Sequence, residues 1–291
     1  MKNRGKSLLA HFGLFYAAAI WGSTFFIVKS VISEVDPVVL VGYRFLLAGA
    51  ILLIFLLVRG HNVFANLKQA VWLGFLLWML YVPQTIGLKY TTASNSGFIT
   101  GLFVAFVPIF LLTIFRRKPT PIEVIASAIS LSGLWVLTGG LVDINTGDML
   151  TLITAMTYAL HLLYSDKFMK AGIDPLVISC QQFLVVGFLS IVSALIFKLP
   201  FGVGSTEAVG MILFLTIFPT LLAFVVQMVA QKTVSPLRVS LIFALEPVFA
   251  GIFAWTLGGE AYVQHRATGG LLIFIGLVVS GLPWPLRFKK S

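Results

Sequence analysis

The chain has 291 residues, of which 59% are hydrophobic and only 10% are charged, whereas ordinary soluble domains carry roughly 25% charged residues. Together with a mean hydropathy of +1.02, this excludes a soluble globular protein and predicts an all-α integral membrane protein. The net charge of +10 would suggest nucleic acid in a soluble protein. In a membrane protein it follows the loops and anionic lipid, so no nucleic-acid partner is expected.

Apolar stretches of about 20 residues, the length that an α-helix needs to cross a bilayer, recur along the whole chain. They predict ten transmembrane helices, at residues 8–28, 37–58, 69–88, 94–115, 122–140, 149–168, 175–197, 208–230, 236–257 and 267–286. The short connections between them leave no room for a soluble domain larger than a loop.

Basic residues are distributed unequally between the two sets of predicted loops. Fifteen lysine and arginine residues fall on the side of the N-terminus and four on the opposite side. Because positive charge is retained on the cytoplasmic side, both termini are expected in the cytoplasm. The sequence thus predicts a multi-pass protein of the cell (inner) membrane, with the lipid bilayer as its partner.

The second predicted span occurs twice. Residues 29–49 read KSVISEVDPVVLVGYRFLLAG and residues 167–187 read KFMKAGIDPLVISCQQFLVVG, with seven identities at a constant offset of 138. A looser match joins VPIF at 107–110 to EPVF at 246–249. The chain is therefore predicted to be two five-helix repeats, 1–143 and 144–291. Five is an odd number, so the second repeat enters the membrane inverted, an arrangement typical of transporters.

Four segments carry a resemblance to a known family: WGSTFFIVK at 21–29, the Asp36-Pro37 start of the second span with Arg44 inside it, GLKYTTASNSGFITGLFVAFVPIF at 87–110, and ALEPVFAGIFAWTLGGE at 244–260. In their order and spacing they resemble the EamA-type members of the drug/metabolite transporter superfamily. The resemblance implies a ten-helix exporter of amino acids, other metabolites or drugs. It does not identify the substrate.

Glu246 is the first candidate for the functional site. It lies about halfway along the span 236–257 and is followed directly by Pro247. An ionised group near the bilayer midplane costs roughly 2.5–3.5 kcal/mol on insertion scales, and proline leaves a backbone carbonyl without its helical partner. A charged, broken helix midpoint is a common substrate position in transporters. The alternative is an ion pair that only holds two helices together.

Arg44 is the second intramembrane charge, seven residues into its span and therefore roughly 10 Å from the end of the helix. Because arginine keeps its proton, it requires an anion or a path to water. Three partners are open: Glu246, a substrate carboxylate, or the outer membrane interface reached by snorkelling. The equivalent residue of the second repeat is Gln182, so the predicted cavity is not electrostatically symmetric.

His161, deep inside the span 149–168, titrates near neutral pH and could carry protons together with Glu246. The alternative is a neutral imidazole that is hydrogen-bonded to a neighbouring helix. Aromatic and amide side chains near span midpoints complete the predicted site, as aromatic walls and polar groups for an amphipathic solute of amino-acid size: Trp21, Trp78, Tyr81, Gln84, Asn95, Tyr158 and Gln227. Four prolines, Pro83, Pro108, Pro219 and Pro247, are predicted to interrupt spans.

Enzyme motifs are absent from the sequence: it has no P-loop and no paired histidine or Glu-x-x-His metal motif. The single cysteine, Cys180, has no intramolecular partner. No catalytic residue, metal or cofactor is therefore expected. The predicted function is the export of a small organic solute by alternating access, driven either by protons or by the solute gradient, in a monomer or homodimer. A non-transporting receptor or a channel is the alternative.

Overall fold

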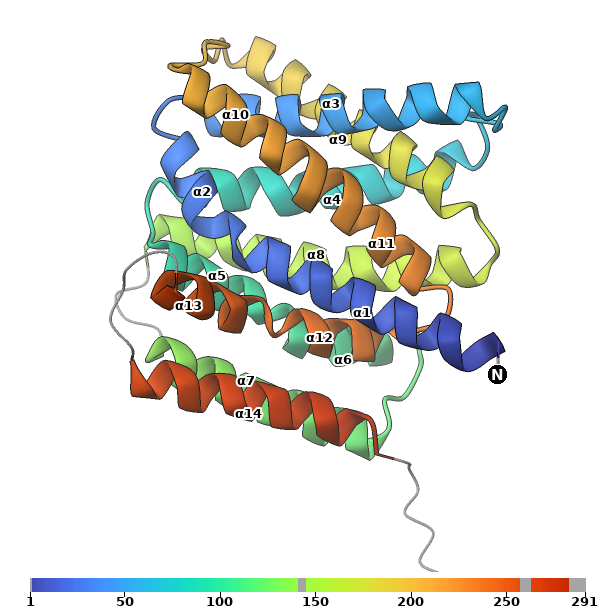
Figure 1. Cartoon of the computed structure of the whole chain (residues 1–291), viewed down its shortest axis with the longest axis vertical. Helices are drawn as coiled ribbons and strands as arrows, with labels where there is room; N and C mark the ends of the chain where they lie inside the picture. Colours follow the sequence, from blue (N-terminus) through green and yellow to red (C-terminus); the bar gives the residue numbers. More distant parts are fainter. Residues whose placement is uncertain (1, 141–144, 257–262, 283–291) are drawn as a thin grey trace, which may run out of the picture.

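The computed structural model describes residues 2–140, 145–256 and 263–282. Its elements are helices (Figure 1): α1 (Lys2–Gly22), α2 (Thr24–Val31), α3 (Pro37–Val58), α4 (Leu67–Gly87), α5 (Ala93–Gly101), α6 (Phe103–Thr113), α7 (Pro121–Thr138), α8 (Thr146–Lys170), α9 (Pro175–Ile196), α10 (Thr206–Leu215), the π-helix η1 (Thr216–Leu222), α11 (Ala223–Ala230), α12 (Pro236–Phe243), α13 (Glu246–Thr256) and α14 (Gln264–Ser280). The predicted boundary at 143/144 lies outside the described residues.

These helices follow the ten predicted spans. The first span consists of α1 and α2, the fourth of α5 and α6, the eighth of α10, η1 and α11, and the ninth of α12 and α13. Within the described ranges, seven helical stretches are long and apolar enough to cross a membrane. The protein is an all-helical membrane protein, as the composition predicts. We call the end of the bundle opposite the start of α1 the distal end (Figure 1).

The repeated Asp-Pro pair starts the same helix in each half. The carboxylate of Asp36 accepts a hydrogen bond from the backbone N–H of Val38 at 2.9 Å, and that of Asp174 accepts one from Leu176 at 2.8 Å. Aspartate at the N-cap satisfies a free backbone donor, and proline at the first helical position has the φ angle of the helix already fixed. The repeat seen in the sequence is thus a repeat of local structure.

The two halves are related by an inverted two-fold arrangement that is visible in the contact between α3 and α9. A Cβ atom placed on Gly49 would lie 2.8 Å from a methyl carbon of Leu184, and one on Gly187 would lie 2.5 Å from Cγ of Leu46. These two pairs exchange under the offset of 138 found in the sequence. The absence of a side chain at both glycines therefore allows the two helices to pack closely along the symmetry axis.

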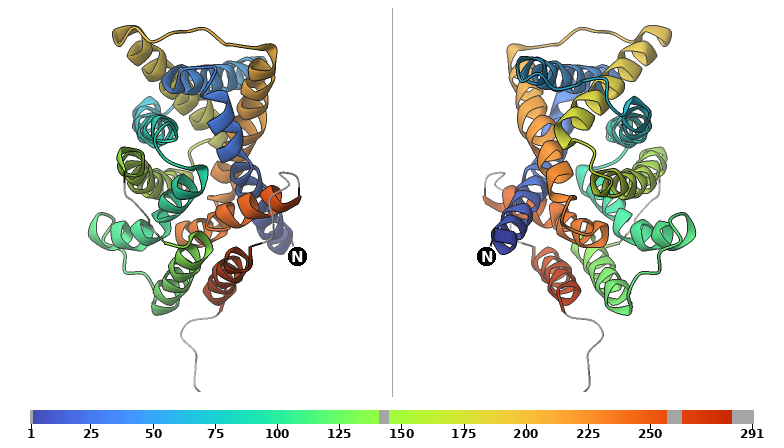
Figure 2. Two further views of the ribbon diagram at one scale, coloured as in Figure 1. Left: turned by 90° about the vertical axis from the view of Figure 1, so that its left-hand side faces the viewer. Right: turned by 90° about the vertical axis from the view of Figure 1, so that its right-hand side faces the viewer.

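The fifth helix of each half repeats this exchange. α7 and α14 lie side by side at one end of the long axis of the molecule (Figures 1 and 2), where Gly133 packs against Ile273 and Gly276 packs against Ser130. Between the two ends, α4 packs against α8 and α1 packs against α11. The third span of each half thus contacts the first span of the other, which brings residues of both repeats into one central region.

The prolines do not all interrupt their helices as predicted. Pro219 lies in the π-helix η1, and Pro247 is the second residue of α13, directly after the break between α12 and α13. Pro83 lies within the continuous helix α4, and Pro108 lies inside α6, six residues after the break at Leu102. Proline removes only one backbone donor, and at these two positions the helix continues past that loss.

Candidate functional site

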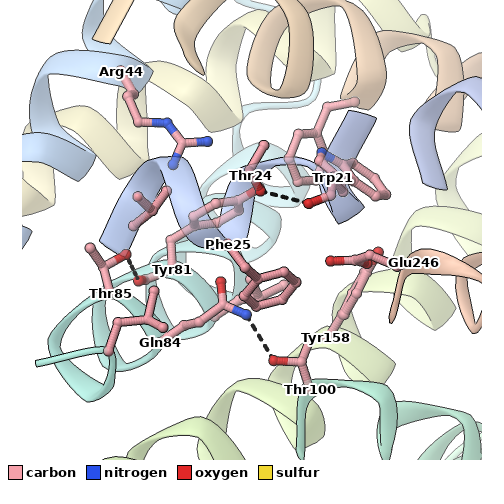
Figure 3. A pocket seen from close by; sticks show the side chains of 14 residues that line it. Trp21, Thr24, Phe25, Arg44, Tyr81, Gln84, Thr85, Thr100, Tyr158 and Glu246 are labelled. Atoms are coloured by element: carbon pink, nitrogen blue, oxygen red, sulfur yellow. Dashed lines mark hydrogen bonds between the residues drawn. The ribbon is translucent and has the colours of Figure 1, made fainter. Parts of the chain in front are cut away.

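A cavity lies in the central region (Figure 3), lined in part by the end of α1, by α2 and by the C-terminal part of α4, which lie toward the distal end in Figure 1. Eight helices, five from the first half and three from the second, supply its lining: Trp21, Thr24, Phe25, Val28, Arg44, Leu80, Tyr81, Gln84, Thr85, Leu88, Thr100, Tyr158, Phe224 and Glu246. It is narrow in this conformation, with about 30 Å³ of space open to water-sized molecules, or roughly two waters. A solute of amino-acid size therefore requires the cavity to widen.

Glu246 enters the cavity as the first residue of α13, and it is 7% exposed. A helix N-terminus stabilises a negative charge, so the break before α13 favours a carboxylate at this position. Gly22 explains the close approach of the first span: a Cβ atom there would lie 2.5 Å from the backbone oxygen of Glu246. The Trp-Gly pair of the first span thus fits the backbone of α13 and places Trp21 beside the carboxylate.

Arg44 lies on α3 and is 2% exposed. Its Nη2 donates a hydrogen bond to Oγ1 of Thr220, in η1 of the other half, at 3.1 Å. The guanidinium carbon lies 5.2 Å from the centre of the Tyr81 ring. Among the described residues, neither Arg44 nor Glu246 takes part in an ion pair.

Two of the three partners considered for Arg44 are therefore not observed. The side chain is too deeply buried to reach the outer membrane interface by snorkelling, and it does not pair with Glu246. The guanidinium and the carboxylate enter the cavity from different sides, from α3 and α13 (Figure 3). Both charges therefore face the same cavity.

Aromatic side chains form one wall of the cavity. The indole N–H of Trp21 donates to the backbone oxygen of Pro219 at 2.7 Å, and the ring lies 5.0 Å from Phe224 and 6.3 Å from Tyr158, measured between centroids. The π-helix η1 is therefore held to the first span by a side chain of the predicted site. On the opposite wall, the amide of Gln84 donates to the hydroxyl of Thr100 at 2.8 Å.

Six predicted residues thus come together in the cavity: Trp21, Arg44, Tyr81, Gln84, Tyr158 and Glu246. The lining residues that the sequence reading missed include Thr24, Phe25 and Val28. They follow Trp21 at three, four and seven residues, the spacing of one helix face. That spacing was available as a signal, although α2 is separated from α1 by the break at Ser23.

The structure places four predicted residues outside this cavity. His161 is fully buried, with its Nε2 2.8 Å from Oε1 of Gln182, which is the alternative of a hydrogen-bonded imidazole. The amide of Gln227 donates to Gln231 at 3.2 Å. These groups form two separate polar pairs outside the cavity lining, and a role for His161 or Gln227 in binding stays a prediction.

Trp78 and Asn95 lie outside the cavity for different reasons. The helix face that reaches the cavity runs through Tyr81, Gln84 and Thr85, whereas the Trp78 ring is half-buried and packs 6.3 Å from Phe75. Trp78 therefore does not line the cavity, although it lies only three residues before Tyr81 on the same helix. Asn95 is half-buried in the first turn of α5, where its backbone N–H donates to the N-cap hydroxyl of Thr92 at 3.0 Å.

The EamA-like transporter family model matches the chain twice, at residues 8–139 and 145–282. The chain belongs to the EamA-like transporter family. It is therefore a membrane transporter and not an enzyme, and its two matched regions are the two five-helix repeats.

Several relatives align along nearly their full length. The uncharacterized inner membrane transporter YedA of Escherichia coli strain K12 is 29% identical, over 96% of this chain and 93% of that protein. An S-adenosylmethionine/S-adenosylhomocysteine transporter of Chlamydia muridarum is 26% identical, over 94% of this chain and 90% of that protein. A probable amino-acid metabolite efflux pump of Salmonella typhimurium is 24% identical, over 92% of this chain and 93% of that protein.

A solved crystal structure shares the fold. It superimposes with a TM-score of 0.79 at 19% sequence identity and covers 94% of this chain and 96% of its own. The likeness concerns the arrangement of the helices alone.

Proposed function

We propose that the protein exports an amino-acid-like metabolite by alternating access, with the cavity between the two repeats as the substrate site and Glu246 as its ionisable centre. The observation that carries this proposal is a buried carboxylate at the start of a half-helix, inside a cavity that also contains an arginine and aromatic walls. Substrate sites of many transporters lie at the interface of inverted repeats and at such helix breaks.

The names of two relatives support an amino-acid-like solute. One is an S-adenosylmethionine/S-adenosylhomocysteine transporter and the other a probable amino-acid metabolite efflux pump. Those solutes share an amino-acid group, which combines a carboxylate and an amine. A cavity that presents one arginine and one glutamate offers a positive charge for the carboxylate and a negative charge for the amine.

The excess of basic residues on the N-terminal side supports a cytoplasmic position for both termini, and the relative YedA is an inner membrane transporter. We therefore place the chain in the cell inner membrane, with the distal end on the outer side. The cavity then lies in the outer half of the protein. Glu246 could exchange a proton there, so a proton gradient and the solute gradient are the two candidate driving forces.

Counterflow in proteoliposomes tests the proposal. Vesicles loaded with unlabelled solute receive labelled L-leucine, S-adenosylmethionine or the cation tetraphenylphosphonium outside, with and without an imposed pH gradient. A transporter that exchanges its substrate accumulates the label transiently above equilibrium, whereas a channel only equilibrates it. We expect this overshoot for an amino-acid-like solute. Overshoot for tetraphenylphosphonium alone would show a cation exporter instead.

The pH gradient separates the two driving forces. An overshoot that is unchanged by the gradient indicates facilitated export, in which Glu246 acts only as a binding group. Flux that appears only with the gradient indicates proton antiport. In that case Glu246→Gln is expected to abolish the dependence on the gradient, because the amide cannot release a proton.

A further inference from the structure

We propose that Arg44 is the carboxylate-binding residue of this transporter, and that the solute is a zwitterion whose ammonium group faces Glu246. This inference rests on the proposed function and specifies its substrate class. It excludes purely cationic and purely anionic solutes as the preferred cargo. It also gives the bound solute an orientation, from α3 toward α13.

The first observation is the incomplete environment of the Arg44 guanidinium. The side chain is 2% exposed, its Nε has no hydrogen-bond partner among the described residues, and its guanidinium contacts the Thr220 hydroxyl and Tyr81. A hydroxyl and the face of the Tyr81 ring compensate a buried charge only in part. Arginine stays protonated, so an anion supplied by the solute would complete this environment.

Carboxylate is the anion that fits best. The planar guanidinium presents several N–H donors in a fixed fork that matches a carboxylate with two parallel hydrogen bonds. Nη2 is engaged with Thr220 and Nε has no partner among the described residues, and Arg44 lines the cavity, so its set of N–H donors is only partly used. A phosphate dianion would place its second negative charge near Glu246, and the cavity lining contains no lysine or second arginine to balance it.

The second observation is the position of Glu246 relative to Arg44. Both side chains line one cavity, which they enter from different sides (Figure 3), and Tyr81 lies within electrostatic range of both. A solute that is only a cation leaves the arginine without an anion, and one that is only an anion faces the glutamate. A zwitterion neutralises both groups at once and adds no net charge to the buried site.

The remaining surface of the cavity indicates where the rest of the solute lies. Trp21, Phe25, Tyr158 and Phe224 form its apolar part, next to Glu246, while Gln84 and Thr100 are already paired with each other. The side chain of the solute therefore contacts aromatic carbon, and an apolar side chain is preferred. L-Leucine, with a branched aliphatic side chain, is a suitable probe.

A series of leucine analogues on the unaltered protein provides the first test. L-Leucine, leucinamide without the carboxylate, and N-acetyl-leucine without the amine compete against labelled leucine in counterflow. We expect the half-inhibitory concentration of each analogue to be at least about tenfold higher than that of leucine, because each analogue leaves one buried charged group of the protein unpaired. Inhibition by either analogue within threefold of leucine would overturn the inference, and this result does not depend on any variant folding.

Arg44→Gln provides the second test, with Arg59→Gln as its control at the exposed C-terminal end of the same helix. We expect Arg44→Gln to weaken the binding of leucine at least tenfold and to change the binding of leucinamide less than threefold, since leucinamide lacks the group that Arg44 binds. Arg44→Lys, which keeps the charge but loses the fork, should fall in between. Equal loss for leucine and leucinamide would make Arg44 a structural residue and overturn the inference.

The outcomes separate this inference from the proposed function. If leucine shows overshoot and leucinamide or N-acetyl-leucine competes within threefold of it, the preference for a zwitterion is wrong and the export of an amino-acid-like solute stands. Overshoot of tetraphenylphosphonium alone contradicts both. If no solute of the panel shows overshoot, both proposals are wrong. Thermal unfolding of each purified variant in detergent, compared with that of Arg59→Gln, identifies a loss of flux that comes from misfolding.

Discussion

Arg44 and Gln182 occupy equivalent positions of the two repeats, yet their surroundings differ. Arg44 reaches across to Thr220 in the other half and faces the cavity. Gln182 bonds to His161 in its own half at 2.8 Å, and both side chains are fully buried outside the cavity. One scaffold thus supports a charged side chain that lines the cavity in the first repeat and a neutral, packed polar contact in the second.

In this inverted repeat, the residues that pack the two halves together are symmetric, whereas the polar residues near them are not. The close approach of α3 and α9 is symmetric, because Gly49 and Gly187 meet equivalent leucines. Five residues earlier in each helix the symmetry ends, because position 44 is an arginine and the equivalent position 182 is a glutamine. The glycines specify how the halves pack, while the side chains at 44 and 182 differ in charge and in whether they line the cavity. Variants that change the charge or the hydrogen-bonding group of these side chains test this difference between the two repeats most directly.

The largest effect is expected from Gln182→Arg, which places a second cation in the neutral repeat. An unpaired buried charge there should destabilise the protein by about 3–5 kcal/mol, because no carboxylate pairs with this position among the described residues. Thermal unfolding in detergent measures the loss. Gln182→Met, similar in size and neutral, should lose much less, and equal melting temperatures for both variants would contradict the account.

Glu246→Gln should lower the initial rate of counterflow about 100-fold, since one missing charged contact in a buried site is worth roughly 3 kcal/mol. Glu207→Gln is the matched control, because Glu207 is exposed in the first turn of α10. The control should keep full activity. Unchanged flux in Glu246→Gln would remove the carboxylate from the substrate site.

Thr220→Val should weaken the binding of leucine about tenfold. The change releases the Arg44 side chain, because Thr220 positions the guanidinium without needing to touch the solute. The half-saturation concentration should rise while the maximal rate changes little. Thr220→Ser, which keeps the hydroxyl, should restore the affinity. A loss that serine fails to restore would show that the Thr220 methyl group, through packing, accounts for the effect.

The smallest effect on transport is expected at His161. His161→Asn should retain the pH profile of counterflow, because the imidazole lies outside the cavity. The stability loss should be about 1 kcal/mol, the value of one hydrogen bond. Flux measured between pH 6 and 8 checks this prediction. A profile that becomes flat in His161→Asn would restore the histidine as a proton carrier.

Local patterns predicted much of the fold. The Asp-Pro pairs at 36–37 and 174–175 marked two helix starts, and the offset of 138 anticipated the two-fold contact. The site was predicted less completely because helix rotation and long-range pairing decide it. Arg44 and Thr220 are 176 residues apart. Trp78 is only three residues from Tyr81 yet packs against Phe75, and spacing alone does not show where a cavity ends along a helix.

Protection of a cavity cysteine by solute is the most direct test that this cavity is the transport site. Thr24 lines it, Ser33 is exposed outside it, and the only native cysteine, Cys180, can be replaced by alanine. An impermeant thiol reagent added from the distal side reports on Thr24→Cys and Ser33→Cys in that background. Our account predicts that saturating L-leucine slows modification at position 24 more than fivefold and leaves position 33 unchanged. Equal rates at position 24 with and without leucine, in a variant that still transports it, would contradict the account.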